Sequence, residues 1–425
     1  MPTNRFRLTA AVAAASFVAI ATGLVSTAPQ AAAATSSVYR VTAGKSAVTD
    51  SAGQSWQPDA TYVHGGSLST SKNTVANTAT PALYRQQRTG DSSYEFPVSA
   101  TGTYGVVIDV AELGNKSPGQ RVYDVLAEGA TVASRVDVAA NAGKNTAWHL
   151  VFSVPVSDGA LDLDIRHITG QPAIGAIAID DVKPGLAPAV TFDDEFNGVS
   201  GSAPDAANWS QDIFPGNNNQ LQYWTDHDAT ADGNGSMVIS ARKESFTGGD
   251  GVTRAYTSAR LTTAGHYTWF YGEAEARIFV PAGQGLWPSF WSVGQKGPWP
   301  SNGEIDGMEM KGQEPKIDHG AVHGLNTNYS EWTYHATTTS TTPLAGQWHT
   351  YAMLWQPGVV ETLVDGRPFM AVTPADVSGA DIWPFDSQPF VLRMQLAVGG
   401  DFVGAPSRST VFPANMLVDW VRVTQ

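Results

Sequence analysis

Three carboxylates lie within six residues of the chain, at Glu304, Asp306 and Glu309. On a β-strand alternate side chains share a face, so Glu304 and Asp306 are expected to point the same way. Glu309 reaches that face only if one extra residue is inserted, and Gly307 is the residue type that most easily accommodates such a bulge. Two carboxyl groups about 5–5.5 Å apart, with a third between them, are the arrangement that retaining glycoside hydrolysis requires.

A solvated acidic edge strand is the alternative interpretation of this segment. Charged residues make up only 15% of the chain, so three acids this close together need a reason. The neighbouring residues Ile305, Met308 and Met310 are apolar, which indicates that much of the segment is buried. The pattern therefore favours a catalytic set over an exposed charged edge.

The strands that would position these acids are indicated by short runs of alternating apolar and polar residues. Such runs occur at 105–110, 161–165 and 176–179, and again at 236–241 and 351–355, whereas helical periodicity is scarce. The 42 glycines and 25 prolines suit many strands joined by tight turns. The sequence therefore predicts an all-β protein built from two β-sandwich domains.

The domain plan follows from the chain length and two breaks in the pattern. At 425 residues the chain is too long for one typical domain. Residues 1–34 combine a basic start, an apolar run and small-residue cleavage sites, so they are predicted to be a secretory signal peptide of an extracellular protein. A break with two prolines predicts a linker at 184–189, between domains at 35–183 and 190–425.

The composition limits the classes of partner. A formal net charge of −14 disfavours nucleic acid, anionic membranes and sulfated polysaccharides. No segment after the leader is long and apolar enough to span a bilayer. The chain has no cysteine, so disulfides and thiolate metal sites are excluded and each fold must rest on its core. A monomer is the default expectation.

Eight segments of the second half resemble, in the family's order, glycoside hydrolase family 16 and within it the laminarinase-type endo-β-1,3-glucanases. They are NNQLQYW at 218–224, YTSAR at 256–260, GLWPSFW at 285–291, GEIDGME at 303–309, GAVHG at 320–324, WPFD at 383–386, LAVGG at 396–400 and VDWVRV at 418–423. Many matches in order are far more specific than one short motif. The second half is therefore identified as a member of this family.

The resemblance implies a concanavalin-like jelly roll whose concave face forms a catalytic cleft. By match to the family's motif, Glu304 is the nucleophile, Glu309 is the general acid/base, and Asp306 lies between them and helps to set their protonation. The chemistry of the residues agrees, because close like charges raise the pKa of one carboxyl and keep it protonated for the leaving oxygen.

Tryptophans are the next informative group, because an indole offers a sugar a large apolar surface with one polar handle. By family match, Trp287 and Trp291 line the subsites beside the cleaved bond, and Arg260 hydrogen-bonds the sugar. Trp299 is expected at the rim of the cleft. Core packing is the alternative for each tryptophan. We favour the cleft for Trp287 and leave both interpretations open for Trp291 and Trp299.

Four further positions carry expectations from the resemblance. His323 matches a family histidine and is expected to hydrogen-bond Glu309 or the sugar, with a buried structural histidine as the alternative. Asn218 is expected to donate a hydrogen bond to substrate, with a simple turn as the alternative. Gln395 is assigned to the substrate-binding residues and stands where relatives often carry Asn. Gly307 stands where a bulky aliphatic residue is more usual, which predicts looser packing behind the acids.

A structural calcium ion is implied by the resemblance alone. Relatives bind it on the convex face, and the matching positions here are Glu195, Gly235 and Asp419. Oxygen ligands suit a hard cation, and such a site would support stability rather than chemistry. No cofactor is expected to be required for the reaction.

The first half resembles a malectin-type carbohydrate-binding domain. The matching segments are TDSAG at 49–53, ALYRQQR at 82–88, GTYGV at 102–106, VAE at 110–112, GQRVYDV at 119–125 and IGAIAI at 174–179. Tyr84 and Tyr62 match positions where relatives bind glucose disaccharides, whereas the segment 113–115 lacks malectin's aromatic pair. A glycan-binding module is favoured, with a structural spacer as the alternative.

Together these observations predict a secreted endo-β-1,3-glucanase that attacks laminarin-like β-glucan with retention of configuration. One alternative keeps the mechanism and changes the polymer to β-1,3-galactan, mixed-linkage glucan or agarose. Another is a non-catalytic glycan-recognition protein, which the three intact acids at Glu304, Asp306 and Glu309 argue against.

Overall fold

The computed structural model describes residues 37–98, 102–183 and 189–425. The predicted signal peptide at 1–34 and residues 184–188 of the predicted linker lie outside these ranges. Within the described residues, no helix has the length and apolar character needed to cross a membrane.

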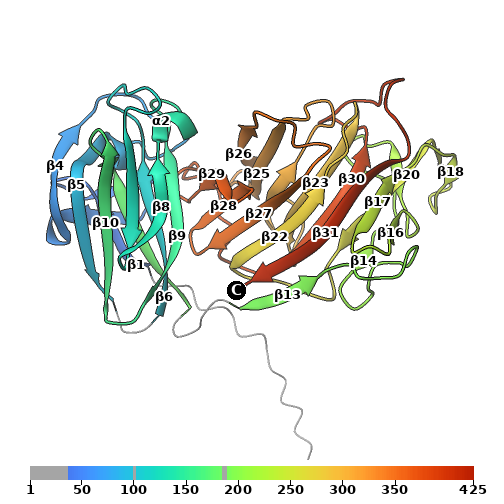
Figure 1. The fold of residues 1–425 in the computed structure, drawn as a ribbon, viewed down its shortest axis with the longest axis horizontal. Helices are drawn as coiled ribbons and strands as arrows, with labels where there is room; N and C mark the ends of the chain where they lie inside the picture. Colours follow the sequence, from blue (N-terminus) through green and yellow to red (C-terminus); the bar gives the residue numbers. More distant parts are fainter. Residues whose placement is uncertain (1–36, 99–101, 184–188) are drawn as a thin grey trace, which may run out of the picture. The chain divides into compact units, whose positions relative to one another are not determined.

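The first sandwich consists of two antiparallel-rich sheets (Figure 1). One sheet has the strand order β2 (Val48–Thr49), β3 (Ser55–Pro58), β1 (Ser37–Thr42), β12 (Ala176–Lys183), β6 (Gly102–Val110) and β9 (Trp148–Val156). The other has the order β11 (Ala173–Ile174), β5 (Gln86–Pro97), β10 (Ala160–Thr169), β7 (Val122–Ala127) and β8 (Ala130–Val136), with β4 (Val63–Thr70) paired to β5. Short helical turns occur at η1 (Asp59–Thr61), α1 (Ala82–Arg85) and α2 (Val138–Asn141).

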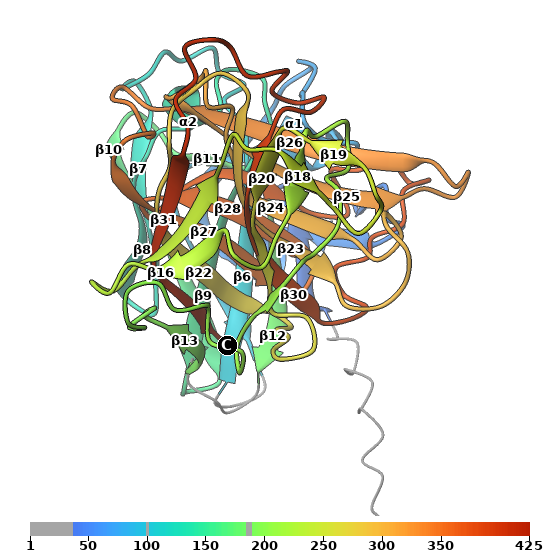
Figure 2. The ribbon, with the colours of Figure 1, turned by 90° about the vertical axis from the view of Figure 1, so that its right-hand side faces the viewer.

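The second sandwich also has two large sheets (Figures 1 and 2). The first runs β16 (Ala229–Ala231), β17 (Met237–Ala241), β31 (Ala414–Thr424), β22 (Gly272–Phe279), β27 (Trp348–Gln356), β28 (Val359–Val364) and β29 (Arg367–Val372), with β13 (Val190–Asp194) beside β31. The second runs β14 (Ser210–Gln211), β21 (Arg260–Thr262), β30 (Phe390–Val398), β23 (Leu286–Gly294), β24 (Glu304–Glu309), β25 (Ile317–Leu325) and β26 (Glu331–Thr339). Two short pairs complete it: β15 (Gln222–Trp224) with β20 (Tyr256–Ser258), and β18 (Phe246–Thr247) with β19 (Thr253–Arg254).

Each sandwich encloses its own apolar core, which is what alternating strands require. In the first, β6 is buried along its whole length because it is a central strand between β12 and β9. In the second, fully buried aromatics such as Trp269, Trp355 and Phe390 fill the space between the sheets. Burying a side chain of this size contributes about 1.5–3 kcal/mol. The all-β prediction is confirmed. The fold is stabilised by its apolar cores and not by disulfides.

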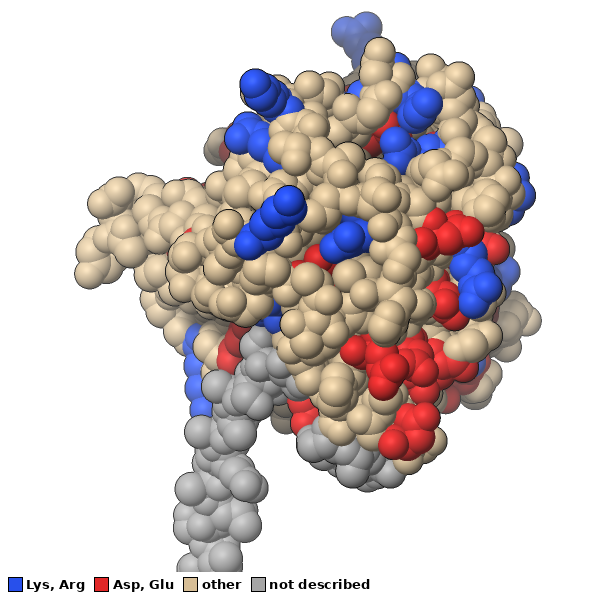
Figure 3. Space-filling view, turned by 90° about the vertical axis from the view of Figure 1, so that its left-hand side faces the viewer, with Lys and Arg blue, Asp and Glu red and all other residues tan. Residues whose placement is uncertain are grey.

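Acidic side chains gather on part of one face of the first sandwich (Figure 3). Within this sandwich, Asp162 on β10 lies opposite Glu95 on β5 in the strand register. Burial, and then repulsion from Glu95, Asp158 and Asp164, raises the pKa of Asp162. Neighbouring carboxylates of this kind oppose the binding of a polyanion to this face.

Candidate active site

The three clustered acids lie on β24, and the strand carries the predicted bulge. In the register with β23, Phe290 lies opposite Met308 whereas Trp291 lies opposite Asp306, so Gly307 is the extra residue. The prediction of a bulge at Gly307 is therefore confirmed. Because of it, Glu304, Asp306 and Glu309 all line the same cleft.

The packing behind the bulge differs from the expectation. A Cβ atom added at Gly307 would lie 2.6 Å from Cγ of Met353, which is fully buried on β27 of the facing sheet. The methionine thus occupies the space that a side chain at position 307 would take, as flexible thioethers do in irregular gaps. The prediction of looser packing was wrong.

One face of the sheet that contains β24 forms the floor of the cleft. Its volume is about 410 Å³. The lining includes nine of the predicted site residues: Glu304, Asp306, Glu309, Trp287, Trp291, Trp299, Arg260, Asn218 and Gln395. They come from β21, β23, β24, β30 and two loops, so the sheet brings together residues that are far apart in the sequence.

Burial dominates the electrostatics of the acids. It raises the pKa of Glu309 to about 8, with repulsion from Asp306 adding to the effect. The pKa of Glu304 is also well above its usual value, because of burial and then the Asp306 and Glu309 charges. Glu304 and Glu309 therefore hold a proton between them near neutral pH, as coupled acid pairs do. Both shifts have the same direction, so they do not distinguish nucleophile from acid.

Two tryptophans contact the outer acids. Trp287 Nε1 donates a hydrogen bond of 2.8 Å to Glu309 Oε1, and this bond favours the charged carboxylate. Trp287 also packs against Phe402, with ring centroids 5.1 Å apart. Trp299 is 51% exposed at the rim, and its hydrogen bond to Glu304 lowers the pKa of that carboxyl. Trp299 is therefore a cleft residue and not part of the core.

His323 pairs with the middle acid rather than with Glu309. Its Nε2 lies 3.1 Å from Asp306 Oδ2, and its Nδ1 lies 2.8 Å from Glu331 Oε1. Burial opposes the charge of the imidazole, but the bond and the charge of Asp306 outweigh it, so the pKa of His323 rises to about 10. A protonated His323 supplies one positive charge beside the acid cluster.

Arginines flank the other side of the cleft. Arg260 is 5% exposed, donates to Asp212 Oδ2 at 2.5 Å, and lies 4.6 Å from the centroid of the Phe214 ring. Arg393, which the sequence analysis did not identify, lies 4.9 Å over the Trp291 ring. Its position two residues before Gln395 on β30 was the available signal, since such residues share a face.

Several buried polar atoms of the cleft have no hydrogen-bond partner among the described residues. Among them are Trp291 Nε1, Gln395 Oε1 and Asn302 Oδ1. Buried polar atoms are normally paired, so these three indicate a polar ligand or water. Trp291 and Gln395 thus fit a substrate role, and Asn302 joins them. Asn218 lies on the lining loop in a left-handed conformation (φ 50°), with its carbonyl accepting from the Asp401 amide at 3.0 Å.

One cluster in the cleft has the donor atoms of a metal site: Glu304, Asp306 and His323. Their ligand atoms lie within 4.8 Å of one another. His323 would have to give up its Nε2 proton before it could ligate a metal ion, because a ligating imidazole is neutral. The contacts among these residues are those of an ion pair between His323 and Asp306 beside Glu304.

The three residues of the predicted calcium site lie near one another beside β31. The β31 register places Glu195, which follows β13, and Gly235, which precedes β17, close to Asp419. However, Asp419 Oδ2 accepts from Arg277 at 2.5 Å and Glu195 accepts from Arg422. Each carboxylate is thus paired with an arginine that a calcium ion would have to displace. The calcium site stays a prediction.

Two family models match the chain. A Malectin domain model matches residues 37–181, and the model of Glycosyl hydrolases family 16 matches residues 216–422. Their order is that of the two sandwiches.

Individual relatives match more than half of the chain. A "Beta-glucanase" of Rhodothermus marinus is 35% identical over 248 residues, which is 55% of this chain and 84% of that protein. A "Glucan endo-1,3-beta-glucosidase" of Cryptopygus antarcticus is 32% identical over 253 residues, covering 54% and 90%. The X-ray structure of an endo-beta-1,3-glucanase from Pyrococcus furiosus matches with a TM-score of 0.52 and 36% identity, covering 56% of this chain and 94% of that one.

Proposed function

Because the chain belongs to glycosyl hydrolase family 16, we propose that it is a secreted enzyme that cleaves internal β-1,3-glucosidic bonds of laminarin-like glucans with retention of configuration. Glycan hydrolysis itself follows from the family, and the enzyme is a glycoside hydrolase of the endo-1,3-β-glucanase type. The observation that supports the proposal is the bulge in β24, because it directs three carboxylates toward one cleft.

The mechanism would be a double displacement. In the first step Glu304 forms a bond to the anomeric carbon while Glu309 gives its proton to the leaving oxygen. In the second step Glu309 takes a proton from water, and that water breaks the glycosyl–Glu304 bond with restoration of the configuration. Burial supports the first step, because it holds the pKa of Glu309 at about 8 and keeps the acid protonated at neutral pH.

Asp306 and His323 would set the charge of the pair. Asp306 is 2% exposed and lies beside both outer acids, so its charge raises the pKa of each. The positive charge of His323 lowers both pKa values again. Opposing effects of this kind adjust when the proton leaves the pair.

The cleft suits a neutral glucan. Trp287, Trp291 and Trp299 offer apolar faces to sugar C–H groups, and Arg260 and Arg393 offer donors to hydroxyls. Three carboxylates on the floor oppose a sulfated chain. Laminarin-like β-glucan is therefore the proposed substrate.

The substrate proposal is tested by product analysis. The mature protein would be incubated with laminarin, lichenan, agarose and β-1,3-galactan. A ladder of short β-1,3-gluco-oligosaccharides from laminarin is expected, and proton NMR during the first minutes should show the β-anomer before mutarotation. Cleavage of another polymer without action on laminarin would overturn the substrate, and an initial α-anomer would overturn retention.

Secretion, oligomeric state and metal dependence are part of the same proposal. When residues 1–425 are expressed, the protein should appear in the medium. Its mass should correspond to cleavage within a few residues of Ala34. Size-exclusion chromatography should show a monomer. EDTA should leave turnover unchanged, and a fall in melting temperature restored by Ca²⁺ would support the structural ion.

A further inference from the structure

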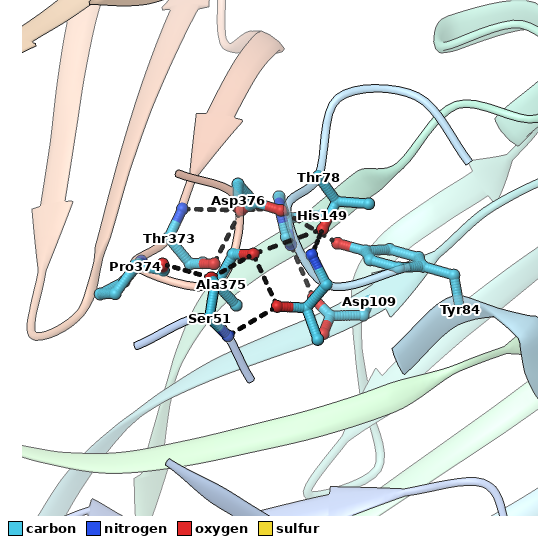
Figure 4. Close-up of polar contacts among 10 residues, drawn as sticks. Ser51, Thr78, Tyr84, Asp109, His149, Thr373, Pro374, Ala375 and Asp376 are labelled. Atoms are coloured by element: carbon cyan, nitrogen blue, oxygen red, sulfur yellow. Dashed lines mark hydrogen bonds and ion pairs between the residues drawn. The ribbon is translucent and has the colours of Figure 1, made fainter. Parts of the chain in front are cut away.

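The face of the first sandwich that carries Tyr84 is covered by residues 373–376 of the second sandwich (Figure 4). Tyr84 is 1% exposed, and its hydroxyl donates to Asp376 Oδ1 at 3.4 Å. Its ring packs in an apolar cluster that includes Ala375 and Val359 of the second sandwich. A sugar ring cannot stack on a side chain closed off in this way, so the expected glycan contact at Tyr84 was wrong.

The second aromatic expected to bind glycan does not join Tyr84. Tyr62 packs instead against Tyr39 and Phe96, with ring centroids 5.2 and 5.0 Å away, in a different apolar cluster. The two tyrosines therefore do not form one sugar platform. The face that carries Tyr84 has to be explained by what it contacts.

Hydroxyl groups hold the backbone of the covering segment. Ser51 Oγ donates to the carbonyls of Pro374 and Ala375 at 3.2 and 3.1 Å. Thr80 Oγ1 donates to the Ala375 carbonyl at 3.0 Å and accepts from the Ser51 amide at 2.9 Å. Backbone carbonyls inside an interface need such donors, so the two surfaces are complementary in detail.

A buried histidine joins the two sandwiches at the same place. His149 on β9 lies 2.7 Å from Asp109 Oδ1 through Nδ1 and 2.8 Å from Asp376 Oδ2 through Nε2 (Figure 4). The amide and the hydroxyl of Thr373 also donate to Asp376 Oδ2, at 2.8 and 2.7 Å. We give the name clamp to Asp109, His149, Thr373 and Asp376 together with Ser51, Thr80 and Tyr84.

Residues 377–386, which follow the clamp in the sequence, contact the end of β25 and the residue before β24. We call them the strap. The Thr327 amide donates to the Ala380 carbonyl at 2.8 Å, and the Ile382 amide donates to the Leu325 carbonyl at 3.0 Å. Leu325 ends β25, the strand that carries His323. The strap therefore holds the end of a strand whose histidine contacts the acid cluster.

The strap also supports the start of β24. A Cβ atom added at Gly303 would lie 2.8 Å from Cγ of Pro384, so this proline packs directly against the residue before Glu304. Gly303 has a φ of 79°, a conformation that only glycine adopts without strain. A displacement of Pro384 would thus displace Gly303 and, with it, Glu304 at the start of β24.

We propose that the first sandwich is a positioning module for catalysis: through the clamp it fixes the strap, and through the strap it fixes Glu304 and His323. Retaining hydrolysis needs its two carboxyls at a set separation, so a displacement of about 1 Å is enough to slow turnover strongly. The module then acts on every substrate, soluble or insoluble, whereas a glycan-binding module acts mainly on insoluble polymer.

The test uses the full chain and graded clamp variants. Ser51→Ala combined with Thr80→Val removes the hydroxyl groups that donate to the Pro374 and Ala375 carbonyls at 3.0–3.2 Å and leaves only the longer bond of 3.4 Å from Thr78 to Ala375. His149→Gln breaks the buried charge contacts as a second variant. Thr89→Val is the matched control, because it removes a hydroxyl-to-carbonyl bond of 3.0 Å to Ser67 within the first sandwich alone. Each is assayed on soluble oligosaccharide and insoluble particles of the polymer that the wild type cleaves.

We expect kcat of the clamp variants to fall by about tenfold on both forms of substrate, with KM nearly unchanged. Amide exchange at 380–382 and 304–306 should become faster, and Thr89→Val should match the wild type in both measurements. If His149→Gln does not fold, the double hydroxyl variant still decides the outcome.

Three results would overturn the proposal. Loss confined to insoluble polymer would mean that the face binds glycan. Faster exchange at 380–382 with wild-type kcat would mean that the strap is not coupled to the acids. Wild-type exchange together with wild-type kcat in both variants would mean that the clamp does not hold the strap. A wild type inactive on every glucan would count against the proposed substrate instead, and exchange would still test the clamp.

Discussion

The cleft and the clamp each hold one histidine between two carboxylates, but they differ in access. In the cleft, His323 lies 3.1 Å from Asp306 and 2.8 Å from Glu331. The side chain of His323 is 19% exposed and that of Glu331 is 40% exposed. Water and substrate can therefore reach this group, and its charge is felt by Glu304 and Glu309, which line the open side.

In the clamp, the same chemical set is sealed. The side chains of His149 and Asp109 are 2% and 4% exposed, and that of Asp376 is fully buried. The carboxylates, Asp376 foremost, raise the pKa of His149 well above its usual value although burial opposes the charge. Asp376 in turn has its pKa lowered, because the charge of His149 and its hydrogen bonds outweigh burial.

The comparison teaches that residue type alone does not assign a role to a charged histidine. Where the set is open and adjoins further acids, its charge can adjust proton transfer. Where the set is sealed between two sandwiches, the same charge holds surfaces together and its loss leaves buried carboxylates unpaired.

Replacing Glu304 by Gln should have the largest effect on the cleft. The amide keeps the shape of the side chain but cannot form the glycosyl–enzyme bond, so kcat should fall by on the order of 10⁴-fold or more. Steady-state hydrolysis of a soluble glucan measures this, and calorimetry should show that oligosaccharide binding remains. Residual activity within tenfold of wild type would contradict the nucleophile assignment.

Replacing each histidine by Ala should separate the two sets by stability. His149→Ala leaves Asp109 and Asp376 buried without their partner, so unfolding should become easier by about 3–5 kcal/mol. His323→Ala leaves Asp306 buried but Glu331 in water, so about 1–3 kcal/mol is expected. Urea unfolding of both variants measures the difference.

A larger loss of stability in His323→Ala than in His149→Ala would contradict the assignment of the two histidines.

The activity of the two variants should differ in its pH dependence. At a temperature where both variants are folded, His323→Ala should change the pH dependence of turnover, whereas His149→Ala should lower kcat by a similar factor at every pH.

The alkaline limit of activity should report the acid in the cleft. Glu309 must be protonated to assist the leaving oxygen, and its pKa is about 8, so activity should be present below that pH and be lost as pH rises through it. In Trp287→Phe the hydrogen bond that lowers this pKa is removed, so the limit should move to higher pH. Profiles of kcat/KM against pH measure both limits, and a limit that moved downward would contradict the assignment.

The sequence was sufficient for the site where the determining contacts are local. The spacing of Glu304, Asp306 and Glu309, with one glycine between them, predicted both the shared face and the bulge. Trp287 and Arg260 were assigned differently, by the resemblance of short ordered motifs to the family, and both line the cleft. Local rules work here because strand geometry fixes the direction of successive side chains.

The rest could not be predicted because it depends on contacts between distant residues. His149 and Asp376 are 227 positions apart, and Tyr84 and Asp376 are 292 apart. Nothing near a single histidine on an alternating strand indicates a partner in the other sandwich. The filling of the space at Gly307 likewise depends on Met353, which belongs to the facing sheet.

The smallest effect is expected at the outer partner of the cleft histidine, in Glu331→Gln. This carboxylate raises the pKa of His323, so its removal should lower that pKa and let the imidazole lose its charge at a lower pH. The side chain is 40% exposed, so stability should change by less than about 1 kcal/mol.

Activity of Glu331→Gln should match the wild type near pH 6, where His323 is protonated in both proteins. Above pH 8 it should decline later, because the positive charge of His323 that lowers the pKa of Glu309 is then lost and this acid keeps its proton to higher pH. Profiles of kcat/KM against pH, with Glu244→Gln on another surface as the matched control, measure the difference. A uniform loss at all pH values would mean that Glu331 acts through packing, and then the open and the sealed histidine would serve the same structural purpose.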